Sequence, residues 1–180
     1  MPMHLELQSP GLQDICHAVD RAQHDALHGL LRELAQGVAR AGDPLADLPE
    51  AARSGNADTY TRHIAYADPH GRYTVAYLVW RPGQYSPIHG HKTWCAYRVL
   101  QGELTETHYR YDASHEHAHE HGRVLRRAGD IITATPGLGQ IHRLGNAGDA
   151  PAISLHIYGV ARADIATGVN LLVREAHTAH

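Results

Sequence analysis

The chain has 180 residues, 43% of them hydrophobic, which is enough for one domain with a hydrophobic core. Its net charge of −3, with the 17 histidines counted as neutral, gives no basis for nucleic acid as a partner. The N-terminus has no secretion-signal pattern, and no apolar run approaches the roughly 20 residues of a membrane helix, so we expect a cytoplasmic protein with no membrane partner.

The first part of the chain is predicted to be helical. Residues 10–41 carry apolar side chains at three- and four-residue steps, after a Ser-Pro start signal. Cys16 lies on the apolar face of this stretch and is expected in the core. We expect a break near His24–Asp25 that divides the stretch into two helices, and a short third helix over 43–53.

Strand-like segments separated by turn residues follow from Asp58 onward. Because they are not interleaved with helical segments, α/β winding is not expected. The pattern predicts a mainly β fold, an antiparallel β-barrel or jelly roll over 58–175 with a helical cap over 1–57, in one domain of residues 1–180. The predicted strands are 59–66, 72–81, 85–90, 94–101, 104–111, 123–127, 130–135, 140–145, 151–159 and 168–174.

One low-complexity run, residues 115–121, alternates histidine with other residues. Such a run could bind nickel or zinc adventitiously. The predicted structure is a solvated hairpin loop, and we assign it no function.

The most informative segment of the chain contains His89 and His91. Side chains at positions i and i+2 of a strand point to the same face, so both imidazoles can bind one metal ion. Imidazole suits iron, zinc, copper and nickel, and the pair alone does not select among them. An isolated pair of this kind is also compatible with a packed or surface position.

The residues around this pair resemble the first signature of the cupin barrels. Most cupins carry a glutamate where this chain has Cys95, and the substitution is similar to that of the cysteine dioxygenase family of thiol dioxygenases. His142, followed four residues later by Asn146, resembles the second cupin signature. The first signature runs Gly83, five residues, His89-x-His91, three residues, Cys95, six residues and Gly102.

This resemblance implies a cupin-type barrel with one Fe(II) per chain, bound by His89, His91 and His142. Three neutral imidazoles leave the full 2+ charge on the metal, which favours capture of an anionic thiolate. The choice of iron depends on the resemblance, not on the ligand types.

A further segment, Ser154-x-His156-x-Tyr158, resembles the family's Ser-x-His-x-Tyr. Strand alternation puts the three side chains on one face, where they are expected to form a hydrogen-bonded chain that brings the Tyr158 hydroxyl to the substrate side of the metal. Cys95 is not expected to bind the metal. In relatives the matching cysteine forms a thioether to this tyrosine; here a Cys95–Tyr158 thioether and a buried, unlinked thiol both stay open. The two cysteines, Cys16 and Cys95, lie in unlike sequence contexts, which argues against a structural disulfide between them.

A substrate clamp is implied by Tyr60-x-Arg62, which resembles the family's Tyr-x-Arg. A guanidinium pairs with a carboxylate through two parallel hydrogen bonds, so Arg62 and Tyr60 are expected to hold a carboxylate at a fixed distance from iron. Trp80 matches a family position that walls the pocket and is equally compatible with a core aromatic. Relatives that prefer 3-mercaptopropionate tend to carry glutamine at the position of Arg62, and an arginine shortly after the tyrosine strand, so the pattern favours L-cysteine.

The resemblance covers roughly residues 58–160 and implies an enzyme, a cysteine dioxygenase that adds both atoms of O₂ to the thiol of L-cysteine and gives cysteine sulfinic acid. Its expected partners are the thiol substrate and O₂, and the expected state is a monomer. Three alternatives stay open. They are a dioxygenase for another carboxylated thiol such as 3-mercaptopropionate or mercaptosuccinate, a zinc or manganese cupin isomerase, and a non-enzymatic cupin that binds a small molecule.

Overall fold

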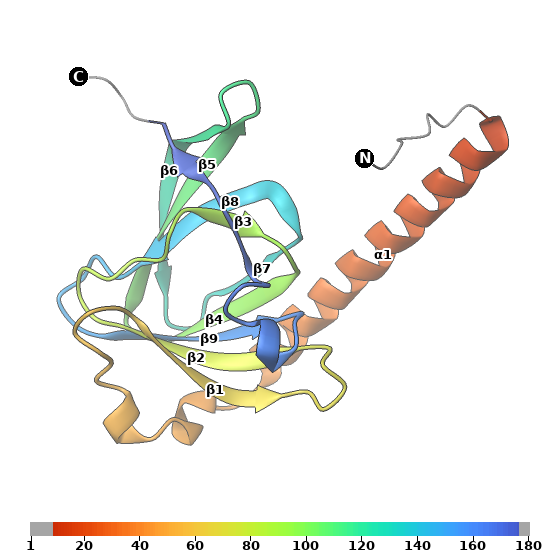
Figure 1. The fold of residues 1–180 in the computed structure, drawn as a ribbon. Coiled ribbons are helices and arrows are strands. Elements are labelled where there is room, and N and C mark those ends of the chain that lie inside the picture. Colours follow the sequence, from red (N-terminus) through yellow and green to blue (C-terminus); the bar gives the residue numbers. More distant parts are fainter. Residues whose placement is uncertain (1–8, 177–180) are drawn as a thin grey trace.

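The computed structural model describes residues 9–176 and shows one N-terminal helix followed by two antiparallel β-sheets that face each other (Figure 1). The helix α1 (Pro10–Arg40) is capped by Ser9, whose side chain accepts a hydrogen bond from the backbone N–H of Leu12 at 3.2 Å. The predicted break in this helix is wrong. Residues 12–28 contain neither proline nor glycine, so nothing interrupts the backbone hydrogen bonds.

The predicted third helix is instead two short 3₁₀ helices, η1 (Pro44–Asp47) and η2 (Glu50–Ala52). Pro49 lies between them and cannot donate the backbone hydrogen bond that a continuous helix needs. A third 3₁₀ helix, η3 (Arg162–Asp164), follows the last long strand. None of the helices within residues 9–176 has the length and hydrophobicity needed to cross a bilayer.

The two sheets confirm the predicted mainly β barrel. All strand pairs are antiparallel except the short parallel pair of β11 with β6. In spatial order the first sheet consists of β1 (Thr61–Ala67), β2 (Thr74–Trp80), β9 (Ala152–Tyr158), β4 (Cys95–Gln101) and β7 (Ile131–Ala134). The second consists of β10 (Asn170–Leu172), β3 (His89–His91), β8 (Gly137–Gly145), β5 (Glu103–Asp112), β6 (His117–Arg127) and β11 (Arg174–Glu175).

The histidine-rich run is mostly strand, and the predicted loop is wrong for most of it. β5 and β6 form a long hairpin in which Asp112 pairs with His117, and β6 continues through His119 and His121. Only residues 113–116 form the turn. Residues 123–127 of β6 were predicted as strand, but the side chains of residues 119–121 are exposed, so the first half of β6 has no apolar face from which a strand could be recognised.

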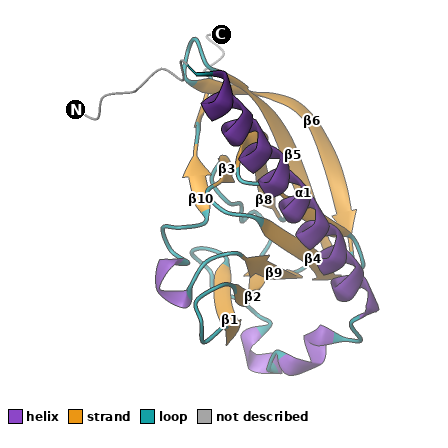
Figure 2. Ribbon diagram, turned by 90° about the vertical axis from the view of Figure 1, so that its right-hand side faces the viewer, coloured by secondary structure: helices purple, strands orange, loops and turns teal. Residues whose placement is uncertain are grey.

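Helix α1 lies against the first sheet only near its C-terminal end, where it contacts β4 and β7 (Figures 1 and 2). Leu31 is buried there, and the Arg98 side chain donates hydrogen bonds to the carbonyl oxygens of Val38 and Ala41 at 3.0 and 3.2 Å. Cys16 lies on the part of α1 away from the sheet and is half-exposed, so its predicted core position is wrong.

The space between the two sheets holds apolar side chains and an unusual set of polar ones. Trp80, Tyr97 and Leu104 are among the largest fully buried side chains. Buried polar residues accompany them, and burial of such groups is favourable only when they have partners or a function. These buried polar residues include Ser86, His89, His91, Glu106, His142, Asn146, Ser154 and His156.

Candidate functional site

Strand pairing brings the three predicted histidine ligands together. His89 and His91 occupy the two ends of β3, and His89 lies directly opposite His142 of the neighbouring strand β8. Gly90 lies between His89 and His91, and its backbone approaches β8 closely. A Cβ atom at this position would lie only 2.5 Å from the carbonyl oxygen of Gly137. Only glycine permits this approach of the two strands.

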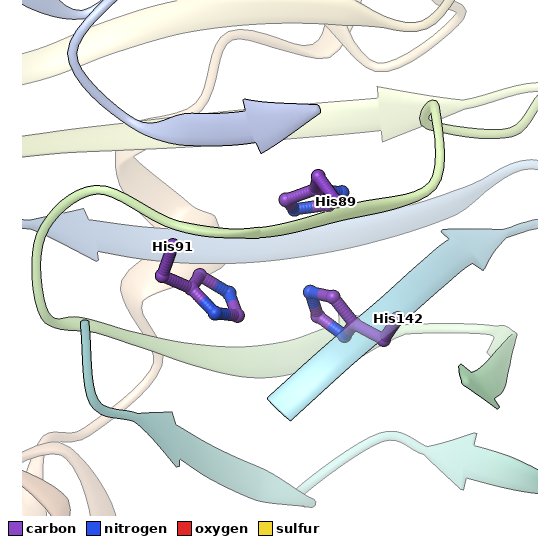
Figure 3. Close-up of side chains that lie close together, drawn as sticks. All are labelled: His89, His91 and His142. Atoms are coloured by element: carbon purple, nitrogen blue, oxygen red, sulfur yellow. The ribbon is translucent and has the colours of Figure 1, made fainter. Parts of the chain in front are cut away.

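The three rings converge on a common point inside the barrel (Figure 3). The ring centroids of His89 and His142 are 4.7 Å apart, and those of His91 and His142 are 5.0 Å apart. One ligand nitrogen from each ring lies within 4.8 Å of the other two. This is the only group of three or more potential metal ligands in the described part of the chain.

The electrostatics of the group suit a metal ion. Burial, reinforced by the neighbouring His142, lowers the pKa of His89 to about 3 and that of His91 to about 4, so both rings are neutral at physiological pH. Neutral imidazole is the form that binds metals. Nδ1 of His89 donates to the carbonyl oxygen of Pro87 at 2.9 Å, which leaves Nε2 free for an ion. Nδ1 of His91 is buried without a hydrogen-bond partner.

A buried carboxylate that the motifs did not reveal supports the third ligand. Nδ1 of His142 donates to Oε1 of Glu106 at 2.6 Å, and Arg126 pairs with Oε2 of the same carboxylate at 2.6 Å. Burial alone would raise the pKa of Glu106, but the hydrogen bond from His142 and the positive charge of Arg126 outweigh it and lower the pKa to about 2. The only feature of the sequence that indicates burial of Glu106 is its position two residues after Leu104, on the same face of β5.

Glu106 fixes the orientation and tautomer of His142, because the hydrogen bond from Nδ1 leaves Nε2 as the nitrogen that faces an ion. Because Arg126 pairs with the same carboxylate, the two charges cancel. The 2+ charge of an ion bound by the three histidines would therefore remain available to an anionic substrate.

We expect Glu106→Gln to weaken metal binding by about 10- to 100-fold, because a neutral amide is a poorer acceptor for His142. Calorimetric titration of the apo-protein with Mn(II) or Co(II) measures this directly. Arg126→Gln is the matched control, since it removes the second partner of Glu106 but leaves the carboxylate on His142. Equal losses in the two variants, or no loss in Glu106→Gln, would contradict the assigned role.

One pocket contains the three histidines together with most of the other predicted site residues. Of the ten residues selected from the sequence, nine line it, and none of the lining residues is acidic. The exception, Ser154, lies behind Trp80 and His156 and hydrogen-bonds to both. The nine are Tyr60, Arg62, Trp80, His89, His91, Cys95, His142, His156 and Tyr158.

Arg62 presents a guanidinium to this pocket with no acidic partner. None of the carboxylates in residues 9–176 forms an ion pair with it, and its Nε is buried without a hydrogen-bond partner. Its guanidinium donates a long hydrogen bond of 3.4 Å to the carbonyl oxygen of Ile165, and a side-chain hydrogen bond links it to Tyr158. Its Cζ lies 5.9 Å from the ring centroid of Tyr158. Tyr60 stacks on Trp80 with a centroid distance of 4.3 Å, and together they form a wall of the pocket. The site is therefore prepared for an anion.

Ser154, His156 and Tyr158 share one face of β9, but the hydrogen bonds differ from the predicted chain. Trp80 Nε1–H donates to Ser154 Oγ at 2.9 Å, and this oxygen also hydrogen-bonds to His156 Nε2 at 2.8 Å. His156 meets Tyr158 by ring stacking, with centroids 5.6 Å apart, and not by a hydrogen bond. Burial lowers the pKa of His156 to about 3 and raises that of Tyr158, so both are neutral.

Cys95 and Tyr158 are directly opposite each other in the pairing of β4 with β9, and both belong to one buried apolar cluster. Burial, followed by the charge of Glu106, raises the pKa of Cys95 to about 12, so the free thiol is neutral. Facing positions of antiparallel strands lie about 4.5–5.5 Å apart, within reach of a side-chain link. The thioether and the unlinked thiol are both still predictions.

Strand β10 and the residue before it add two pocket residues that no sequence motif indicated. Val169 and Asn170 line the pocket, because β10 pairs with β3 and places Asn170 opposite His91. Arg162, by contrast, is exposed in η3 and is not among the lining residues.

Comparison with known proteins agrees with this architecture. A solved structure of an uncharacterised Klebsiella pneumoniae protein with a double-stranded β-helix domain matches 76% of this chain and 93% of its own length, with 18% identity and a TM-score of 0.51. A cupin 2 conserved barrel domain protein from Salinispora arenicola matches 66% and 91% of the two chains, with 18% identity and a TM-score of 0.46. The sequence profile described as cysteine dioxygenase type I matches residues 26–165. This chain therefore belongs to the cysteine dioxygenase family.

Proposed function

We propose that the protein is an Fe(II)-dependent dioxygenase that oxidises L-cysteine with O₂ to cysteine sulfinic acid. The observation that carries this proposal is the unpaired guanidinium of Arg62, which faces the same pocket as the three-histidine group in a member of this family. A small amino acid with a thiol could bind both groups at once, with its carboxylate on Arg62 and its sulfur at the metal.

The charges of the pocket favour such a substrate. No acidic side chain lines it, so an anionic ligand meets only the positive charge of Arg62 and of the ion. The guanidinium of Arg62 can donate hydrogen bonds to both oxygens of a carboxylate, which fixes the orientation of the remaining atoms of the substrate. Trp80 and Tyr60 limit the volume on that side and exclude water.

The donor set fits Fe(II), since His89, His91 and His142 offer three neutral nitrogens on one side of the ion. When bound there, Fe(II) supplies the one-electron chemistry with O₂ that no side chain of the chain can supply. The overall reaction balances without another reductant, because the sulfur loses four electrons and O₂ gains four.

Tyr158 and His156 have supporting roles in this proposal. Tyr158 keeps its proton, because burial raises its pKa, and is therefore a hydrogen-bond donor in the pocket. Neutral His156, held by Ser154, stacks on Tyr158 and limits the rotation of its ring. Proximity of the bound thiol and this donor then supplies much of the rate enhancement.

L-cysteine is proposed over 3-mercaptopropionate because the arginine of the pocket is Arg62. The family pattern associates 3-mercaptopropionate with a glutamine at this position and an arginine after the tyrosine strand. The nearest arginine there, Arg162, is exposed outside the lining residues.

The test is an oxygen-electrode assay on apo-protein reloaded separately with Fe(II), Mn(II) and Zn(II), with product identified by mass spectrometry. The panel is L-cysteine, 3-mercaptopropionate, mercaptosuccinate and cysteamine, which lacks the carboxylate. We expect O₂ uptake only with Fe(II), and a kcat/KM for L-cysteine at least about tenfold above the others. Preference for another carboxylated thiol would contradict L-cysteine as the substrate. Thiol binding without O₂ uptake would contradict the proposal that the protein is an enzyme.

A further inference from the structure

The N-terminal half of α1 exposes its apolar side chains to solvent as well as its polar ones. Every residue of 10–26 is exposed except Cys16, which is half-exposed, and this half of the helix stands away from the sheets (Figure 1). Isolated helices of this length are only marginally stable in water, and most helices in proteins are stabilised by packing of an apolar face.

An apolar stripe nevertheless begins in this half and extends to Leu30. Leu12, Ile15, Val19 and Leu30 are 44%, 61%, 49% and 43% exposed, although their three- and four-residue spacing is that of a packed helix face. The remaining members of the stripe are Cys16, Ala22 and Ala26, and the other side of the helix carries Asp14, His17, Arg21, His24, Asp25 and His28.

The barrel of the same copy cannot cover this stripe. The side of α1 that packs on the sheet is centred on Leu31 and Leu34, and at 100° per residue the stripe centred on Val19 is rotated by roughly a quarter turn from it. A contiguous exposed apolar surface of this kind marks an interaction site.

We propose that the stripe, residues 12–30 of α1, binds the same stripe of a second copy of this chain in antiparallel orientation. The stripe is self-complementary about its midpoint near Arg21, because antiparallel pairing sets Leu12 against Leu30 of the other copy and Cys16 against Ala26. Closed pairs of this kind are the commonest oligomers. Antiparallel helix dipoles attract, and the two barrels lie at opposite ends of the pair.

An anionic membrane fits the stripe less well than a second copy. Helices that lie on such membranes carry lysine and arginine on their polar face. Here the polar side carries two aspartates, Asp14 and Asp25, against one arginine, Arg21, and no lysine, so it has no net positive charge with which to bind such a membrane.

The size of the contact sets the expected strength. Residues 12–30 span about 27 Å of helix, and two such helices at a spacing of about 8–10 Å bury on the order of 1,000 Å². That is the lower end of specific interfaces, so we expect a dissociation constant on the order of micromolar. The monomer expected from the sequence is the opposite prediction, and one measurement decides between them.

Sedimentation equilibrium of the full chain from about 1 to 200 μM tests the dimer. Val19→Glu places a charge in the centre of the stripe and is expected to raise the dissociation constant at least about tenfold. His17→Glu, on the polar side of the same helix, is the matched control and should leave it unchanged. Oxygen uptake with cysteine should be the same in both. A wild-type monomer over this range, or a dimer indifferent to Val19→Glu, overturns the proposal.

Disulfide crosslinking tests the orientation. In Ala26→Cys, antiparallel pairing sets the new thiol of one copy opposite Cys16 of the other, and diamide should convert the two thiols to an interchain disulfide by accepting two electrons and two protons. Peptide mapping identifies the linked positions. The wild type, with Cys16 alone on α1, should not crosslink through this helix. A rapid Cys16–Cys16 link in the wild type would indicate parallel pairing and overturn the orientation.

Discussion

His142→Ala is expected to abolish tight metal binding and thiol oxidation together. The substitution removes one of the three nitrogens that lie within 4.8 Å of one another, and it leaves the buried carboxylate of Glu106 without its donor. Loss of a ligand exceeds the 10- to 100-fold effect typical of losing its hydrogen-bond partner, so we expect affinity to fall by more than about 100-fold. Metal titration of the apo-variant by calorimetry, with metal content of the purified protein, measures the loss.

Two controls keep this result interpretable. The exposed and half-exposed histidines of the β5–β6 hairpin could take up metal themselves, so a variant with His115, His117 and His119 changed to asparagine should retain the tight site and full activity. His142→Gln keeps a polar side chain of similar length, and circular dichroism establishes that either variant is folded. Tight stoichiometric binding in a folded His142 variant would remove this residue from the metal site.

Strand periodicity and the family motifs together predict most of this site. His142, Cys95, Tyr60 and Arg62 were identified through the motifs. His89 and His91 share a face because alternate residues of a strand always do, whatever the rest of the fold. The same holds for Ser154, His156 and Tyr158 on β9. Glu106 could not be identified in this way, because its contact with His142 depends on how β5 pairs with β8.

The errors in the fold have the same origin. The first half of β6, His117–Gly122, has no apolar face, so only residues 123–127 were predicted as strand, and the pairing with β5 determines its full extent. The predicted break near His24–Asp25 in α1 is likewise wrong. The structure shows one continuous helix whose two faces have different surroundings, the sheet at Leu31 and solvent at Val19. Local propensity predicts the helix, but not what each face contacts.

Arg62→Ala is expected to raise the KM for L-cysteine strongly while the metal stays bound. Arg62 is the only arginine or lysine among the lining residues of the pocket. Its Nε has no hydrogen-bond partner, so a substrate carboxylate need not displace one there. Loss of a charge-assisted pair in such a site costs about 2–4 kcal/mol, which corresponds to a roughly 30- to 900-fold change in kcat/KM. Steady-state oxygen uptake over a range of cysteine concentrations measures it, and calorimetry establishes that metal affinity is unchanged.

The decisive comparison is between L-cysteine and cysteamine, which lacks the carboxylate that Arg62 is proposed to bind. Cysteamine has the thiol and amine of cysteine but no carboxylate, so its slower oxidation should be nearly insensitive to Arg62→Ala. The two removals, one from the protein and one from the substrate, form a double-mutant cycle whose coupling energy isolates the contact. Arg62→Lys keeps the charge without the planar fork and should give an intermediate KM. Equal losses for cysteine and cysteamine would mean that Arg62 supports the pocket wall beside Tyr158 and does not bind the carboxylate.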